Sequence, residues 1–128
     1  MFYSINLNRC KMGNFKKLRV WQIAKDLTIE IYKITKSNKF LKDWGLKDQI
    51  QRAAVSIPAN ISEGDELGTN KQSVRHLFIA KGSVAELQTL LIISKEIEYI
   101  NQETLNLLDN ECNLISVMLG KLIKARMS

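Results

Sequence analysis

Residues 49–64 read QIQRAAVSIPANISEG, and no other segment says more about the fold. The apolar residues of this segment recur every three or four positions, which is the pattern of one face of an α-helix. They are Ile50, Ala53, Ala54, Ile57 and Ile61. We therefore predict a helix from about residue 46 to residue 63. Its alanines and Ser56 are small, so a neighbouring helix can approach this face closely.

Two residues of this segment interrupt an ordinary helix. Pro58 removes one backbone hydrogen bond and crowds the carbonyl of Ala54, which costs roughly 3 kcal/mol unless the surroundings compensate. We expect the helix to bend near Val55 for this reason. Gly64 is expected to end the helix, because glycine adopts left-handed backbone angles without steric penalty.

The flanking segments carry the same periodicity. We predict a first helix from about residue 16 or 18 to residue 36. A third helix is expected to begin with Thr69 or Asn70 as its N-cap and to reach about Tyr99, and a fourth to follow the N-cap Asn101. The fourth has the clearest apolar seam, spaced alternately by three and four residues: Leu105, Leu108, Cys112, Ile115, Leu119 and Leu122.

Four long amphipathic segments with short connections predict an all-α chain, folded as an antiparallel up-down-up-down four-helix bundle. The 128 residues suit one domain of ordinary size. We expect the bundle domain over residues 15–128. Residues 1–14 show no apolar periodicity and are expected to form an N-terminal extension.

Basic residues are concentrated near the two ends of the chain. Of the 19 Lys and Arg residues, eleven precede residue 48 and three follow residue 120. In an antiparallel bundle the first helix begins where the fourth ends. We therefore predict one basic cluster that could bind nucleic acid, made of Lys16, Lys17, Arg19, Lys121, Lys124 and Arg126. The alternative is a solvated, lysine-rich surface that serves solubility only.

Patterns typical of catalysis and of metal binding are missing from the sequence. His76 is the only histidine, whereas a di-iron site in a helical bundle needs two Glu-x-x-His motifs. Cys10, Cys112 and His76 do not have the spacing of zinc ligands. No glycine-rich phosphate loop and no nucleophile elbow occur. We predict no enzyme activity, no cofactor and no metal, with His76 as a surface or interface residue.

Several polar residues lie beside the apolar helix faces: Arg52, Asn60, Glu63 and Glu86. We predict an ion pair between Arg52 and Glu86 that joins the second and third helices and fixes their register. Asn60 is assigned a structural role, as are Pro58 and Gly64. The alternative interpretation is an exposed polar cluster that binds a ligand.

Two segments carry more apolar surface than a monomeric bundle needs. Residues 90–93 are apolar all round, and the fourth helix has a second apolar row made of Leu107, Leu114, Val117 and Met118. We therefore expect a homo-oligomer. No run of about 20 apolar residues occurs, and no secretory signal pattern is present, so we expect a cytoplasmic protein without membrane association.

The central segment resembles the bacterial four-helix-bundle proteins that are encoded in intervening sequences of 23S rRNA genes. The similarity extends from about Trp21 to Tyr99, and it includes residues 79–87, which read IAKGSVAEL. The chain departs from that family pattern at residues 40–41, which read Phe-Leu where members often carry Phe-Pro. Another departure is the acidic pair at residues 65–66, where members often carry basic residues after the glycine.

The resemblance implies a four-helix bundle that assembles as a homopentamer and has no enzyme activity. A relative of that family, the accessory protein of diversity-generating retroelements, binds a reverse transcriptase and nucleic acid through a basic surface. The resemblance therefore implies RNA or DNA as a partner, together with a reverse transcriptase or another protein. The alternative is a protein–protein scaffold or adaptor with no nucleic-acid role.

Overall fold

The computed structural model describes residues 14–67 and 69–127. In chain order its elements are the 3-10 turn η1 (Phe15–Lys17) and the helices α2 (Arg19–Ile34), α3 (Asn38–Leu41), α4 (Trp44–Glu66), α5 (Asn70–Glu96) and α6 (Gln102–Met127). No strand occurs in these two ranges, so the predicted all-α class is confirmed for them. The predictions for the N-terminal extension at residues 1–13 and for Cys10 lie outside the described residues.

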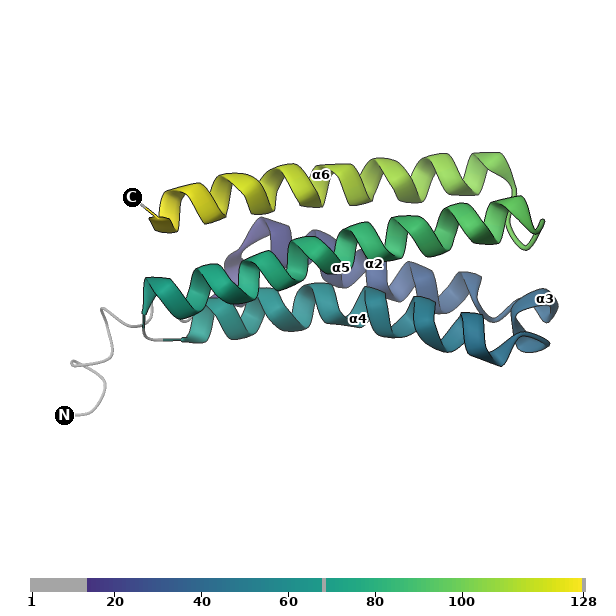
Figure 1. The fold of residues 1–128 in the computed structure, drawn as a ribbon, viewed down its shortest axis with the longest axis horizontal. Coiled ribbons are helices and arrows are strands. Elements are labelled where there is room, and N and C mark those ends of the chain that lie inside the picture. The colour runs from purple at the N-terminus through teal and green to yellow at the C-terminus, as the bar shows by residue number, and fades with distance from the viewer. Residues whose placement is uncertain (1–13, 68, 128) are drawn as a thin grey trace.

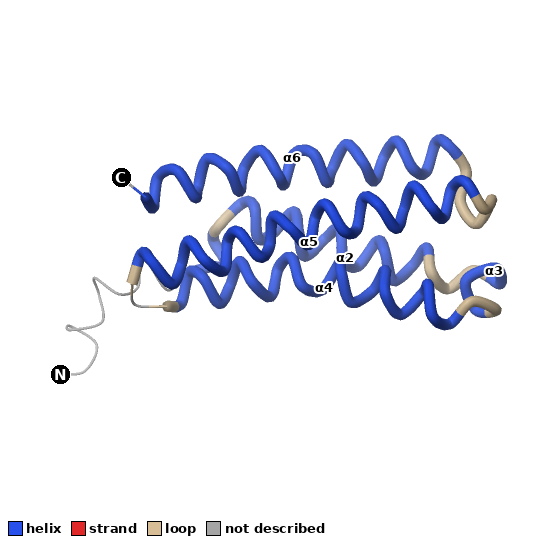
Figure 2. The backbone as a smooth tube through the Cα atoms, viewed as in Figure 1, coloured by secondary structure: helices blue, strands red, loops and turns tan. Residues whose placement is uncertain are grey.

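The four long helices lie side by side along one axis (Figure 1). The loops that connect them stand at the two ends of the helices (Figure 2). α4 packs most extensively against α5, α5 packs against α6, and α2 packs against α4, whereas the seam between α2 and α6 is the weakest of the four. The described part of the chain is therefore a helical bundle.

The centre of the bundle is filled by one face of each long helix. The largest fully buried side chains are Phe40, Leu27, Ile31, Ile50, Ile57, Ile61, Leu77, Leu87, Leu91, Ile115, Leu119 and Val84. Burying one such Leu or Ile side chain stabilises the fold by about 1.5–3 kcal/mol. The predicted periodicity of residues 50–61 and 105–122 correctly located the apolar faces of α4 and α6.

Pro58 stands inside α4, and the helix continues through it to Glu66. Proline has no N–H, so the carbonyl of Ala54 loses its normal partner one turn later. The hydroxyl of Thr28 in α2 lies 3.1 Å from this carbonyl oxygen, and 2.8 Å from the carbonyl oxygen of Ala24 in its own helix. The single hydroxyl proton of Thr28 is thus shared between a carbonyl of its own helix and the carbonyl that the proline left without a donor.

Gly64 does not end α4, so that prediction is wrong. The glycine is buried inside the helix, and no glycine of the described chain has a positive φ. A Cβ on Gly64 would lie 3.1 Å from the carbonyl oxygen of Ser73 and 3.3 Å from the Cβ of His76. The missing side chain lets the first turns of α5 pack closely against the last turns of α4.

The short helix α3 was not predicted, because four residues are too few to show a helical period. Its residue Phe40 is fully buried, and the ring of Tyr99 meets it edge-on at a centroid distance of 5.2 Å. The Tyr99 hydroxyl donates to Asp43 Oδ2 at 3.0 Å, and Lys39 Nζ donates to the carbonyl oxygen of Glu98 at 2.6 Å. α3 therefore closes one end of the bundle.

The connection between α5 and α6 satisfies its own backbone groups. Glu98 adopts a φ of 67°, and its N–H donates to the carbonyl of Lys95 at 3.0 Å. The N–H of Tyr99 donates to the carbonyl of Ser94 at 2.7 Å, which completes a Schellman motif. Asn101 then caps α6, as predicted, because its Oδ1 accepts from the N–H of Thr104 at 2.8 Å.

Candidate nucleic-acid interface

The predicted ion pair between Arg52 and Glu86 does not form. Arg52 Nε lies 2.8 Å from Oδ2 of Asp48, one turn earlier in the same helix, and the Arg52 side chain is 78% exposed. Glu86 is exposed on α5. The prediction is wrong because Arg52 precedes the buried pair Ala53–Ala54 and so falls on the solvent side of α4, where Asp48 is within reach.

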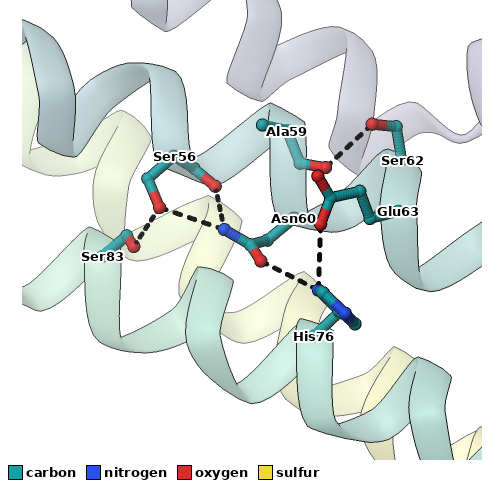
Figure 3. Close-up of polar contacts among 7 residues, drawn as sticks. All are labelled: Ser56, Ala59, Asn60, Ser62, Glu63, His76 and Ser83. Atoms are coloured by element: carbon teal, nitrogen blue, oxygen red, sulfur yellow. Dashed lines mark hydrogen bonds and ion pairs between the residues drawn. The ribbon is translucent and has the colours of Figure 1, made fainter.

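A network of side-chain hydrogen bonds joins α4 to α5 instead (Figure 3). Asn60 Nδ2 donates to Ser56 Oγ at 3.0 Å and to the carbonyl oxygen of Ser56 at 2.8 Å. Ser83 donates to the carbonyl oxygen of Ile79 at 3.0 Å, so its contact of 2.8 Å with Ser56 Oγ uses the proton of Ser56. Each serine hydroxyl therefore donates once and accepts once.

His76 occupies the other end of this network. Asn60 Oδ1 lies 3.0 Å from His76 Nδ1, and Glu63 Oε2 lies 3.3 Å from the same nitrogen (Figure 3). Both neighbours are acceptors, so Nδ1 carries the proton, and in the neutral ring the lone pair is on Nε2. Neither serine is hydrogen-bonded to His76 in the network, so it contains no nucleophile–base pair of the kind that hydrolases use. It fixes the register of α4 and α5, the role predicted for Arg52 and Glu86.

Arg126, one of the six predicted nucleic-acid-binding residues, points into the protein. Its Nη2 lies 2.9 Å from Asp65 Oδ1, and its Nη1 donates to Ser73 Oγ at 2.8 Å. The Arg126 side chain is 16% exposed and that of Asp65 only 3%. The last turn of α6 is thereby joined to the end of α4 and to the start of α5. Asp65 Oδ2 is buried and has no hydrogen-bond partner among the described residues.

The other five predicted residues fall into two groups. Lys16 and Lys17 lie in η1, which packs against α2 and α4, and Arg19 is the first residue of α2. Lys121 and Lys124 lie on α6. The first group therefore lies beside α2 and α4, and the second group lies on α6. The role of these residues in binding stays a prediction.

A larger set of cations gathers where the first half of α5 meets the second half of α6. The contacts of Ser73 with Arg126 and of Gln88 with Asp109 show that the two helices run antiparallel, so these halves lie together. Residues 67–85 contain no acidic residue, and none follows residue 111. We call the exposed cations of these two halves the α5–α6 basic face: Lys71, Arg75, Lys81, Lys121 and Lys124.

Within this basic face, four side chains have no acidic partner. Among the described residues, Lys71, Arg75, Lys81 and Lys121 take part in no ion pair. Lys81 crosses towards α6, where its Nζ lies 3.7 Å from the place that a Cβ on Gly120 would occupy. The charges are thus available for an anion outside the protein.

The three cations of α5 were not among the predicted residues, because that prediction considered only the two basic ends of the chain and residues 48–120 contain more acidic than basic residues. The charge pattern that indicates these cations is confined to one short segment. Residues 67–85 carry cations only, and Lys71 and Arg75 are spaced by four residues on one helix face, with Lys81 less than two turns further along.

The seam between α2 and α6 has the opposite charge. Glu30, Glu111, Ile34, Leu107 and Leu108 contribute to the lining of a groove of about 330 Å³. Burial raises the pKa of Glu111, and the nearby carboxylates of α2 raise it further. Like charges at this seam repel a polyanion.

Cys112 lies on the buried face of α6. Cys112 is buried, and burial with nearby carboxylates raises its pKa to about 12, so its thiol is a packed, protonated group at neutral pH.

α5 is long and apolar enough to cross a membrane, by length and composition alone, which the prediction of no such segment did not foresee. The core helix of a soluble protein passes the same test, and one face of α5 is buried in this bundle.

The sequence and the fold are similar to those of known proteins. A sequence profile described as 23S rRNA-intervening sequence protein matches residues 16–121. The fold is similar to a crystal structure of a protein with unknown function from the S23 ribosomal protein family of Bacteroides thetaiotaomicron. The two chains are 26% identical with a TM-score of 0.76, and the match covers 82% of this chain and 98% of the other. No curated protein matches the chain.

Proposed function

We propose, from the premise that the chain belongs to the 23S rRNA-intervening sequence protein family, that it is a non-enzymatic, homo-oligomeric protein that associates with nucleic acid or a ribonucleoprotein. Its four long helices form an antiparallel up-down-up-down bundle in this proposal. It acts in the cytoplasm, without a cofactor and without a membrane segment. The α5–α6 basic face is the binding surface.

The observation that supports binding is a set of exposed cations without an ion-pair partner among the described residues. Lys71, Arg75, Lys81 and Lys121 are exposed, and none is neutralised by an ion pair among the described residues. A phosphate backbone that binds such a surface releases condensed counterions, which drives sequence-independent association. Nucleic acid is therefore the polyanion that this face fits best.

Exposed apolar side chains support the homo-oligomer. Ile92 and Ile93 on α5, and Leu107, Leu114 and Val117 on α6, remain exposed in the single chain. Apolar surface of this extent is favourably buried between copies. We take the number of copies as five from the resemblance. Assembly repeats the basic face, and linked weak sites gain avidity.

Light scattering tests the assembly. We expect a mass several times that of the 14.7 kDa chain at micromolar concentration. A Leu107→Ser, Leu114→Ser double variant should lower this mass because it removes apolar interface area. A wild-type protein that is monomeric under these conditions would reject the homo-oligomer.

A titration at several salt concentrations tests nucleic-acid binding. We expect the wild-type protein to bind labelled RNA and DNA at low salt. A Lys81→Glu, Lys121→Glu variant removes two phosphate contacts, so the slope of log affinity against log salt for duplex DNA should become less steep by about 1.8. The matched control is Lys33→Glu, Lys36→Glu, which reverses two exposed charges on and just after α2.

A third variant, Lys16→Glu, Lys17→Glu, separates the η1 cations from the basic face. If it weakens binding and the Lys81, Lys121 variant does not, the surface lies at η1. No binding by the wild-type protein at low salt would overturn the nucleic-acid proposal.

The second candidate is a protein–protein scaffold, which the same exposed apolar side chains favour. An apolar protein interface responds little to ionic strength, whereas phosphate contacts weaken steeply with salt. A partner complex that persists at high salt, from a protein that binds no nucleic acid, would favour the scaffold.

A further inference from the structure

One aromatic ring stands exposed among the cations of the α5–α6 basic face. Phe78 is 53% exposed on α5. It follows Arg75 by three residues and precedes Lys81 by three, and residues so spaced share one side of a helix. Exposure of a large apolar ring to water is unfavourable, so the position of Phe78 among cations needs an explanation.

The register of α5 and α6 sets Phe78 at the same level of the bundle as the cations of α6. Lys81 lies over Gly120, and the helices run antiparallel, so the turn before Lys81 meets the turn after Gly120. Phe78 is in that turn of α5, and Lys121 and Lys124 are in that turn of α6. Gly82, one turn after Phe78 on α5, has no side chain that would shield the ring.

We propose that an unpaired base of single-stranded nucleic acid stacks on Phe78 while the adjoining phosphates lie against Arg75, Lys81 and Lys121. This inference rests on the proposed function and adds to it a preference for single strands. The bases of a duplex stack on one another and present only their edges, so a duplex can use the cations but not the ring. The preference is tolerant of sequence, because every base has a stacking face.

An interface between copies is the competing use of Phe78, and the surrounding charges oppose it. Interface centres are depleted of charged residues, and lysine is disfavoured there. Two basic faces that met would repel each other. The exposed apolar pair Ile92 and Ile93 lies about four helical turns further along α5, outside the cation-only half. That pair is better suited to contact another copy.

The test compares single strands with duplex, using fluorescently labelled oligonucleotides of about 20 nucleotides, longer than the site of one single-strand-binding fold. The probes are oligouridylate, oligothymidylate and a DNA duplex of the same length. The variants are Phe78→Ala, the conservative Phe78→Trp, and Ile79→Ala as a matched control at an exposed apolar residue of the same helix.

We expect Phe78→Ala to weaken single-strand binding by about five- to 150-fold, the value of one stacked base, and to leave duplex binding nearly unchanged. Phe78→Trp should bind single strands as the wild-type protein does, and Ile79→Ala should not affect single-strand binding. RNA and DNA single strands should respond alike, because the stacking surface does not sense the 2′-hydroxyl.

Three results would overturn the inference. Equal weakening of single-strand and duplex binding would mean that Phe78 supports the surface without stacking. An unchanged affinity for single strands would remove Phe78 from the interface, while the proposed function would stand. A lower mass by light scattering, with the ratio of the two affinities unchanged, would place Phe78 between copies. Failure of the wild-type protein to bind any probe would instead refute the proposed function itself.

Discussion

Replacing Arg126 by alanine should destabilise the protein strongly. The substitution leaves Asp65, which is 3% exposed, with no hydrogen-bond donor to either carboxylate oxygen among the described residues. Removing one partner of a buried ion pair typically costs about 3–5 kcal/mol. The pair lies at the end of α6, where fraying lets water reach the carboxylate, so we expect the lower limit, about 3 kcal/mol.

The assay is thermal unfolding followed by circular dichroism at one fixed protein concentration, because assembly makes Tm depend on concentration. For a chain of this size about 3 kcal/mol corresponds to a fall in Tm of roughly 10 °C. Lys121→Ala is the matched control on the same helix and should change stability by less than about 0.5 kcal/mol. A double variant, Asp65→Leu with Arg126→Met, should recover most of the loss because it leaves no buried charge.

A Tm for Arg126→Ala equal to that of Lys121→Ala and of the wild-type protein would show that the pair of Arg126 with Asp65 does not stabilise the fold. A second measurement separates stability from binding. Well below Tm, Arg126→Ala should bind nucleic acid as the wild-type protein does, because its guanidinium is occupied by Asp65 and Ser73. A large loss of affinity at that temperature would return Arg126 to the binding surface.

Three substitutions test other contacts. Gly64→Ala should lower Tm, because its Cβ would lie 3.1 Å from a backbone carbonyl oxygen, whereas Gly82→Ala, with nothing within 4 Å, should gain up to about 1 kcal/mol from helix propensity. Thr28→Val should cost about 1–3 kcal/mol in chemical denaturation, and the cost should shrink in a Pro58→Ala background, where a backbone N–H again serves the carbonyl. Glu111→Gln should raise Tm at pH 7. The folded protein raises the pKa of this carboxyl, so its ionisation disfavours the folded state, and the gain should vanish below about pH 4.5.

The sequence predicted the helices well because each long helix buries a face with a clear period. Cys112 and Leu119 show this on α6, and the cap at Asn101 follows from a local backbone rule. Side-chain partners were harder to predict. Arg52 found a carboxylate one turn away in its own helix, and the partner of Arg126 lies 61 residues earlier in the chain. A long polar side chain near the edge of an apolar face has several partners in reach, and only the packing of the helices selects among them.

The role of Gly64 was mistaken for a related reason. Glycine after a helical pattern can mark the end of a helix or a place where a second helix approaches closely, and both give the same sequence signal. The cations of α5 were not predicted because the prediction considered only the two basic ends of the chain. A window of one or two helical turns, read together with the antiparallel pairing of helices, would have shown the cations of α5 beside those of α6.

The Schellman motif at Glu98 has a consequence for the order in which the chain folds. Because the connection satisfies its own backbone groups, the α5–α6 hairpin requires no distant segment in order to turn. Contacts across it, such as Gln88 with Asp109 at 3.0 Å, join residues that are near in sequence, and such contacts close with little loss of chain entropy. We expect this hairpin to be formed in the folding transition state, whereas the buried pair that joins α6 to α4 spans 61 residues and should form afterwards. Conservative substitutions should therefore slow folding when they lie in the hairpin and accelerate unfolding when they lie at that pair.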